Sequence, residues 1–238
     1  MPIEKYPFRI IRSPGRKRIA LRFAPDGILE VRIPADISDD IAIKAVNDNP
    51  DIIAGLKKRT PVKKAPDLSG KSPFMLLGEP YPLRFTHNLR VFDHAFLIPR
   101  GSAEEIKKSM IMLYRELANI IIRKRLPEFI RQTGTTPKKI RITDAATRWG
   151  SCSSAGTISF SWKLIQCPAP AVDYVIVHEL SHLKEMNHSP KFWTLVKKII
   201  PDYRDRKKLL NEFANSLPDW DQKETFTSPE TSTGGSIS

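Results

Sequence analysis

Apolar and polar residues alternate near the N-terminus, and this pattern predicts β-strands. Apolar side chains recur at every second position through residues 19–23 and again through 28–33, which is the period of a strand with one buried face. Between them, residues 25–27 read Pro-Asp-Gly, a tight-turn sequence. We therefore expect residues 7–35 to form strands joined by a turn.

Residues 36–99 are predicted to form a helical region, a loop and a second β region, in that order. Residues 36–58 have a helical pattern with a break near Asn47-Asp-Asn-Pro50. Residues 61–72 are rich in Pro, Lys, Ser and Gly and predict a loop. A second β region spans residues 73–99, with strand pieces at 84–85, 89–92 and 95–98.

The clearest helix start is at Ser102. Glu105 follows three residues later, as in a capping box. Apolar residues then recur at helical spacing, at positions 106, 110, 113, 117 and 120 or 121. Pro127 is expected to end or kink this helix.

The remaining pattern completes the predicted architecture. Short strands are expected at 139–143 and 157–160, and a helical reading begins at Ala169. The chain is thus predicted to be α+β, with a β-rich N-terminal lobe in residues 1–100 and a catalytic lobe in 101–216. Residues 217–238 turn to Ser, Thr, Gly and acidic residues, which predicts a disordered tail.

Composition narrows the class of protein. The 238 residues are 40% hydrophobic and 27% charged, as in an ordinary globular protein, and the formal net charge is +13. The basic residues are scattered, which is typical of solvated surface, although they could steer acidic substrates or nucleic acid. No apolar run is long enough for a membrane span or a secretory signal. Because Cys152 and Cys167 form no disulfide framework, we expect a cytoplasmic protein without a membrane partner.

The segment His178-Glu-Leu-Ser-His182 carries the candidate chemistry. Histidines at i and i+4 lie on one helical face, about 6 Å apart along the axis, where both can bind one zinc ion. Glu179 lies about 100° around the helix and flanks the metal, so it is placed to take a proton from water. The opposite side of this helix is apolar and is predicted to face the core. Its residues are Val172, Ile176, Leu180 and Leu183.

A catalytic zinc site needs a third protein ligand, and the sequence offers several. On a straight helix Glu185 would lie about 10 Å along the axis from His178, which is too far. Carboxylates of a following helix are alternatives: Asp202, Asp205 and Glu212. The preferred ligand is His188, because Asn187 can adopt the left-handed conformation that ends helices, and Ser189-Pro190 can start a new one. His87 and His94 carry no comparable pattern and are expected at the surface or in packing.

Several motifs in order make the sequence similar to a known family. They are Thr147-Arg-Trp-Gly-Ser-Cys-Ser-Ser154, Gly156-Thr-Ile158, Trp162-Lys-Leu-Ile165, 173–182, Asn187-His-Ser189 and Phe192-Trp193. These residues resemble the YgjP-like metallopeptidases, which are related to SprT-like and WLM-type zinc peptidases. The resemblance covers roughly residues 10–215, and it departs at Ser161, where the family often has Asn. It implies a β-rich N-terminal lobe, a zincin-like catalytic lobe and His178, His182 and His188 as ligands.

A metzincin assignment fits less well. That motif requires Gly where this chain has Glu185, and no Met follows Met186 to form a Met-turn.

Three further residues are candidates for roles near the metal. Arg148 could stabilise an oxyanion or bind a substrate carboxylate or phosphate, or else pack the strand region against the helix. Cys152 is better explained as a small buried residue, and Tyr174 as part of the core.

The sequence therefore predicts a zinc-dependent hydrolase, a peptidase acting on a peptide or protein, with one Zn²⁺ per chain and Glu179 as general base. One alternative is a metal-dependent hydrolase of a non-peptide substrate such as a nucleotide phosphoanhydride. A further alternative is a nucleic-acid-associated zinc protein. The sequence does not predict the oligomeric state.

Overall fold

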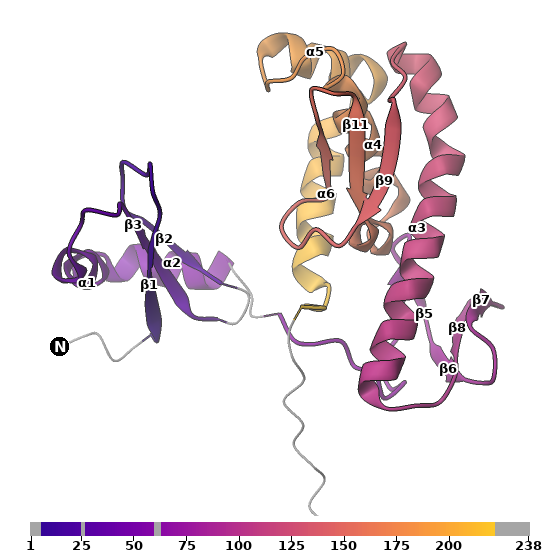
Figure 1. Cartoon of the computed structure of the whole chain (residues 1–238), viewed down its shortest axis with the longest axis horizontal. Helices are drawn as coiled ribbons and strands as arrows, with labels where there is room; N and C mark the ends of the chain where they lie inside the picture. Colours follow the sequence, from indigo (N-terminus) through magenta and orange to yellow (C-terminus); the bar gives the residue numbers. More distant parts are fainter. Residues whose placement is uncertain (1–5, 25–26, 60–62, 222–238) are drawn as a thin grey trace, which may run out of the picture. The chain divides into compact units, whose positions relative to one another are not determined.

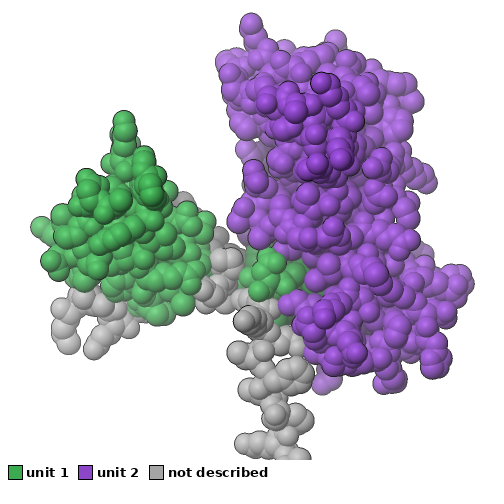
Figure 2. Space-filling view, in the orientation of Figure 1, with its two compact units in different colours: residues 1–66, 218–238 green, residues 67–217 purple. Residues whose placement is uncertain are grey.

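The protein folds into two compact units. The computed structural model describes residues 6–24, 27–59 and 63–221. The first unit takes its described residues from Met1–Pro66 and Pro218–Ser238, and the second is Asp67–Leu217 (Figure 2). Within the described residues, no helix has both the length and the apolar character needed to cross a membrane.

The first unit is a three-stranded sheet with two helices. Its strands, in the order β1-β3-β2, are β1 (Phe8–Arg12), β3 (Leu29–Ile33) and β2 (Ala20–Phe23). β1 is parallel to β3, and β2 is antiparallel to it. The helices are α1 (Asp39–Asn47) and α2 (Pro50–Arg59). The helix break predicted near residues 47–50 is confirmed, whereas the predicted turn at 25–27 lies partly outside the described residues.

One face of this sheet forms the core with the helices. The buried residues of the cluster are Phe23, Leu29, Val31, Ile33, Ala42, Val46 and Ile53. Because side chains alternate along a strand, the intervening residues of β3 point to the other face of the sheet.

The second unit begins with five short strands that pack on a long helix. They are β4 (Phe74–Leu76), β5 (Glu79–Tyr81), β6 (Leu83–Phe85), β7 (Arg90–Phe92) and β8 (Ala95–Ile98). In α3 (Ala103–Thr133), Tyr114 contacts Phe96 at 5.1 Å and stacks on Trp162 at 5.5 Å between ring centroids. The Tyr114 hydroxyl donates to the Met75 carbonyl at 2.8 Å.

This packing moves the boundary between the units away from the predicted position. Residue 100 was predicted to end the N-terminal lobe, but β4–β8 belong to the same compact unit as α3. The buried contacts of Tyr114 and Phe96 explain the difference, because they join these strands to α3. Of the predicted tail, residues 218–221 belong to the first unit, and 222–238 lie outside the described residues.

The long helix begins as predicted but ends later. Ser102 accepts from the Glu105 backbone N–H at 3.3 Å, and the Glu105 carboxylate accepts from the Ser102 N–H at 2.7 Å, which confirms the capping box. Pro127 was expected to end or kink the helix; it does not end it, since α3 continues to Thr133 and closes on left-handed Gly134. Burial of Leu126 and Thr133 on either side of the proline offsets the lost hydrogen bond.

The second half of this unit surrounds one central helix. A sheet of order β10-β11-β9 contains β9 (Lys139–Thr143), β10 (Gly150–Cys152) and β11 (Thr157–Ser161). A 3₁₀ turn, η2 (Trp162–Gln166), leads to α4 (Ala169–Ser181), α5 (Pro190–Ile199) and α6 (Tyr203–Ser216). Figure 1 shows the sheet in front of α4, with α3 on one side and α6 on the other; α3, α5, α6, η2 and strand β10 of the sheet contact α4.

Enclosure by these elements makes α4 more buried than an amphipathic pattern predicts. Val172, Ile176 and Leu180 are fully buried, as expected of the core-facing side. Val175 and Val177, on other sides of the helix, are also at most 4% exposed. His178, in the last turn of α4, is less buried than these residues. The observed class is mixed α and β, as predicted.

Candidate metal centre

Three histidine rings converge where α4 ends. Nε2 of His178 lies 3.3 Å from Nε2 of His182 and 3.1 Å from Nε2 of His188. Their ligand atoms all lie within 4.8 Å of one another, and such a group can hold a metal ion. The structure thus brings together the three residues that the sequence singled out.

The spacing of the nitrogens fits a tetrahedral ion. Nitrogen ligands at about 2.0–2.1 Å from a tetrahedral zinc are separated from one another by about 3.3–3.4 Å. The 3.1 and 3.3 Å separations around His178 are close to this value. Since facing nitrogen lone pairs repel, a proton or a cation between them is needed to stabilise the cluster.

The chain reverses direction between His182 and His188 by tight turns. After α4, the backbone N–H groups of Lys184 and Glu185 both donate to the Ser181 carbonyl, at 3.1 and 3.0 Å. The expectation that Asn187 is left-handed is wrong, because the described non-glycine residues with positive φ are Leu77, Asp93 and His94.

Side chains make the second half of the reversal. Asn187 Oδ1 accepts from the Ser189 N–H at 3.2 Å, and Ser189 Oγ accepts from the Phe192 N–H at 3.3 Å. Ser189 is the N-cap of α5 and Pro190 is in its first turn, as predicted. A short turn closed by Asn187 and Ser189 therefore returns His188 to the end of α4.

Burial favours the neutral, metal-binding form of His178 and His182. Burial, together with the neighbouring charges of His182, His188 and Lys207, lowers the pKa of His178 to about 3. Burial also lowers the pKa of His182, against a hydrogen bond to the Glu185 carbonyl that raises it. Neutral imidazole is the form that ligates metals.

The hydrogen bond of His182 also selects its tautomer. Its Nδ1 lies 3.0 Å from the backbone oxygen of Glu185. Because a carbonyl only accepts, Nδ1 carries the proton and the Nε2 lone pair is directed at the other two rings. Glu185 thus supports a neighbouring ring through its backbone, while its carboxylate is outside the histidine cluster.

The carboxylates considered as alternative third ligands are not in the cluster either. Asp202 accepts twice from Arg206 Nε, at 3.0 and 3.1 Å. Glu212 lies 3.8 Å from Lys208 on the same helix. Asp205 likewise falls outside the group, which leaves His188 as the residue that completes it.

Glu179 lies in a confined, apolar position beside the histidines. It is 5% exposed, and its Oε2 is buried without a hydrogen-bond partner. Burial raises its pKa to about 7, and the positive charge of Arg148 opposes this rise. A carboxyl group with a pKa near neutrality can both accept and return a proton.

Gly150 of β10 provides the space for this carboxylate. A Cβ atom at position 150 would lie 2.7 Å from both Cγ and Oε1 of Glu179. No side chain other than hydrogen fits there without displacing Glu179. The edge strand β10 therefore positions the carboxylate, a contact that the sequence analysis did not find.

Three side chains interact electrostatically with the Glu179 carboxylate: Arg148, Cys152 and Tyr174. Arg148 is exposed just before β10 and interacts electrostatically with Glu179. Burial and the charge of Glu179 raise the pKa of Cys152. Burial, Glu179 and Tyr203 raise the pKa of Tyr174 to about 12. Tyr174 is buried, as expected, whereas Cys152 is only half-buried.

Aromatic residues enclose the histidines on the α5 side. Phe192 is fully buried, and its ring centroid lies 4.5–4.9 Å from those of the three histidines. Trp193 stacks on His188 at 5.7 Å and on Tyr203 at 5.2 Å. The sequence singled out Phe192 and Trp193 as part of the family resemblance but not as neighbours of the histidines, because their contact with the rings depends on the chain reversal.

Comparison with known proteins assigns this arrangement to a class. A family model described as "YgjP-like, metallopeptidase domain" matches residues 17–213. The crystal structure of the metallopeptidase zymogen of Pyrococcus abyssi abylysin is similar at 21% identity and a TM-score of 0.36, over 40% of this chain and 98% of that chain. A search of curated proteins gives no match.

Proposed function

The chain belongs to the YgjP-like metallopeptidase family, and on this premise we propose that it is a zinc-dependent peptidase with His178, His182 and His188 as ligands. The convergence of three Nε2 atoms at the end of α4 carries the proposal. The second unit would then be the zincin-like catalytic lobe. Three histidines leave the fourth position of a tetrahedral ion open, as catalysis requires.

Zinc held there would act as a Lewis acid on the scissile carbonyl and would acidify water. Glu179 acts as the general base, removing a proton from the attacking water and passing it to the leaving amine nitrogen. Its buried, unpartnered Oε2 supports this role. Arg148 supplies a positive charge near Glu179, where it can stabilise negative charge that develops on the substrate oxygen.

The substrate is proposed to be a peptide or protein in the cytoplasm. The thiol of Cys152 is in no disulfide, which suits a reducing compartment.

Cleavage of a quenched fluorescent peptide library tests the proposal. The zinc-loaded wild type is expected to cleave it, and Glu179→Gln is expected to lose at least about a hundredfold in kcat while retaining its metal. Hydrolysis of nucleoside triphosphates in place of peptides, also lost in Glu179→Gln, would favour the non-peptide hydrolase instead. Equal cleavage by both proteins would contradict the assignment of Glu179.

A further inference from the structure

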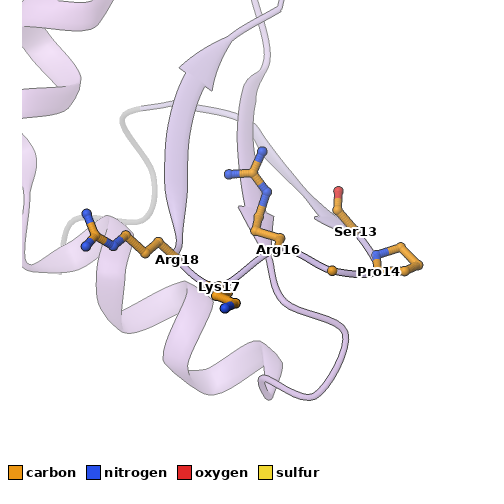
Figure 3. Close-up of a pocket in the computed structure, with 6 residues that line it drawn as sticks. Ser13, Pro14, Arg16, Lys17 and Arg18 are labelled. Atoms are coloured by element: carbon orange, nitrogen blue, oxygen red, sulfur yellow. The ribbon is translucent and has the colours of Figure 1, made fainter.

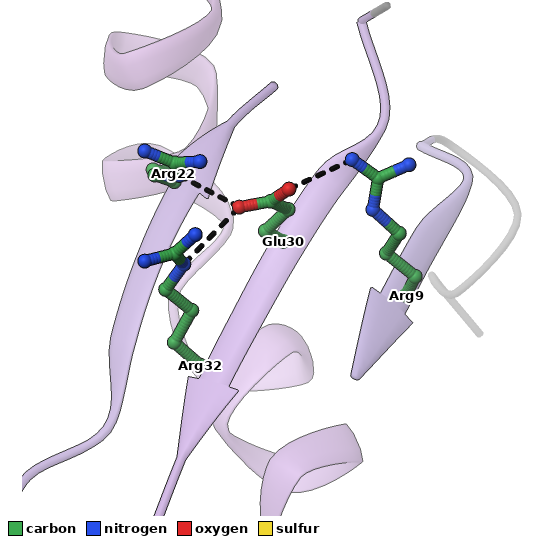
Figure 4. A network of polar contacts seen from close by, with 4 residues as sticks. All are labelled: Arg9, Arg22, Glu30 and Arg32. Atoms are coloured by element: carbon green, nitrogen blue, oxygen red, sulfur yellow. Dashed lines mark hydrogen bonds and ion pairs between the residues drawn. The ribbon is translucent and has the colours of Figure 1, made fainter. Parts of the chain in front are cut away.

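The first unit has a buried carboxylate that organises three arginines on the sheet face opposite its core. Arg9 and Arg22 each donate to Glu30 at 2.7 Å, and Arg32 donates at 3.1 Å (Figure 4). They come from all three strands, because Glu30 pairs with Arg9 on β1 and with Arg22 on β2. Glu30 is 4% exposed.

This cluster leaves positive charge at the surface. One carboxylate faces three guanidinium groups, and the arginine side chains remain 44%, 49% and 31% exposed. Each bond to Glu30 occupies one of about five N–H donors of a guanidinium. Glu30 thus carries one negative charge against the three positive charges of the arginines that it holds in place.

The loop at one end of the same sheet adds three consecutive cations. It joins β1 to β2 and forms an open pocket lined by Ser13, Pro14, Gly15, Arg16, Lys17 and Arg18 (Figure 3). The three cationic side chains in Figure 3 point in different directions and do not converge on one point. Such a loop suits several successive anionic groups better than a single bound anion.

The sheet face and its loop are poor in acidic residues. The sequence holds no acidic residue between Glu4 and Asp26. Apart from Glu30, the acidic residues of the described segment 27–59 lie in or beside α1 and α2, on the helical side: Asp36, Asp39, Asp40, Asp48 and Asp51. The helices carry cations as well, including Lys44 on α1 and Lys57 on α2, so the sheet face and the loop are the part of this unit where positive charge is least offset, and an anionic partner is attracted there.

From this arrangement we propose that the sheet face and the loop 16–18 bind the phosphate backbone of a nucleic acid. We call this surface the arginine face, made of Arg9, Arg22 and Arg32 with Arg16, Lys17 and Arg18. Planar guanidinium groups match phosphate oxygens bidentately, and contacts of this kind carry most sequence-independent nucleic-acid affinity. The exposed large apolar residues of this unit, Ile41 and Ile52, lie on α1 and α2 and not on the arginine face, which argues against a membrane surface.

Binding of the full-length protein to a fluorescent 20-base-pair DNA duplex tests this proposal, which goes beyond the peptidase assignment. Affinity measured by anisotropy is expected to fall steeply with salt, by about 0.9 in log K per log salt for each phosphate contacted. The triple variant Arg16→Gln, Lys17→Gln, Arg18→Gln is expected to bind at least about tenfold more weakly, with a slope smaller by about 2 to 3. These loop residues lie outside the Glu30 network, so this variant should fold even if Arg22→Gln does not.

A matched triple variant removes the same charge from the second unit. Arg84→Gln, Lys108→Gln, Arg123→Gln changes three exposed residues and should bind within about twofold of wild type, because a charge outside the binding surface acts only through the general field, which salt screens within about 10 Å. His178→Ala should bind equally well. Equal losses in both triple variants, or affinity independent of salt, would overturn the proposal. Competition by polyglutamate as effective as by unlabelled DNA of equal charge would also overturn it and would indicate an acidic protein partner.

Discussion

Nε2 of His188 lies 3.1 Å from Nε2 of His178, although ten residues and a complete reversal of the chain separate the two histidines. The reversal combines the tight turns after Ser181 with the side-chain hydrogen bonds of Asn187 and Ser189. The third nitrogen of the site thus depends on a turn, while the other two come from the end of one helix. This dependence shapes the predictions for the metal centre.

Replacing Gly150 by Ala should impair Glu179 without removing a catalytic group. The added Cβ would lie 2.7 Å from Glu179 Cγ, so the carboxylate must shift, and overpacking of this kind costs about 1–3 kcal/mol of stability. Because a misplaced catalytic group can cost about a hundredfold in rate, we expect a loss of at least tenfold (about 1.4 kcal/mol) in kcat with unchanged zinc content.

Gly55→Ala is the matched control for this substitution. Nothing lies within 4 Å of a Cβ at position 55, inside α2, and alanine is favoured over glycine in a helix by about 1 kcal/mol. This variant should keep full activity and unfold at a slightly higher temperature. Wild-type kcat in Gly150→Ala would show that β10 does not position Glu179.

In the metal-free protein, ionisation of Glu179 should lower stability as the pH rises. Its pKa is raised to about 7 by burial, against a smaller lowering by Arg148, from an ordinary value of 4.5. The folded protein therefore binds this proton more tightly than the unfolded chain. The stabilisation is complete below pH 4.5 and is lost as the pH rises through 7, by about 2–3 kcal/mol between pH 5 and 8.

Urea unfolding in the presence of a chelator measures this effect. From pH 5 to pH 8 the wild type should lose unfolding free energy relative to Glu179→Gln, because only the wild type has the ionising carboxyl group. His178 cancels in this comparison, because both proteins carry it. A difference independent of pH would show that Glu179 titrates normally.

Removing Arg148 should raise the pKa of Glu179 further. Arg148 is the positive charge that favours the ionised carboxylate, so in Arg148→Gln the acidic limb of the kcat/KM profile should move to higher pH, and kcat should fall about tenfold or more if the guanidinium also stabilises the oxyanion. Zinc content should not change. Arg123→Gln, an exposed site on α3, is the control for loss of one charge. If the acidic limb does not move in Arg148→Gln, Arg148 does not influence the ionisation of Glu179.

Glu30 should stabilise the first unit at neutral pH. Burial favours its protonated form, but hydrogen bonds from Arg22, Arg9 and Arg32 outweigh this and lower its pKa from 4.5 to about 2. Its contribution is present above pH 4.5 and is lost as the pH falls from 4.5 through 2. Because the arginines are partly exposed and solvent screens them, we expect Glu30→Gln to cost about 2 kcal/mol at pH 7.

Hydrogen exchange of the β3 amides reports this change locally. Protection in β3 should fall in Glu30→Gln at pH 7, and the second unit should be unaffected. Glu104→Gln removes an exposed carboxylate whose partner Lys108 is 3.8 Å away and should leave protection unchanged. Wild-type protection of β3 in Glu30→Gln would show that the arginines need no carboxylate.

The sequence predicted features set by local chemistry and missed features set by distant contacts. The capping box at Ser102 and the start of α5 at Ser189 follow from neighbouring residues, and both are present. The grouping of the histidines also followed from spacing and turn residues, although the assumed left-handed Asn187 was wrong. Their role as ligands stays a prediction.

Contacts between remote segments left no comparable signal. Gly150 precedes Glu179 by 29 residues, and nothing in the local pattern around a strand glycine shows which side chain will occupy the space beside it. Likewise, the attachment of β4–β8 to α3 depends on the buried rings of Phe96 and Tyr114, whose partners cannot be read from periodicity.

Zinc content measured by elemental analysis of wild type and His188→Ala, both purified without added metal, tests the central claim most directly. We expect about one zinc per chain in the wild type, because three neutral nitrogens fit a tetrahedral ion, and a sharply lower content in His188→Ala with a wild-type circular dichroism spectrum. Full zinc retention in a folded His188→Ala would contradict the three-histidine site, and absence of zinc from the wild type would contradict the zinc peptidase itself.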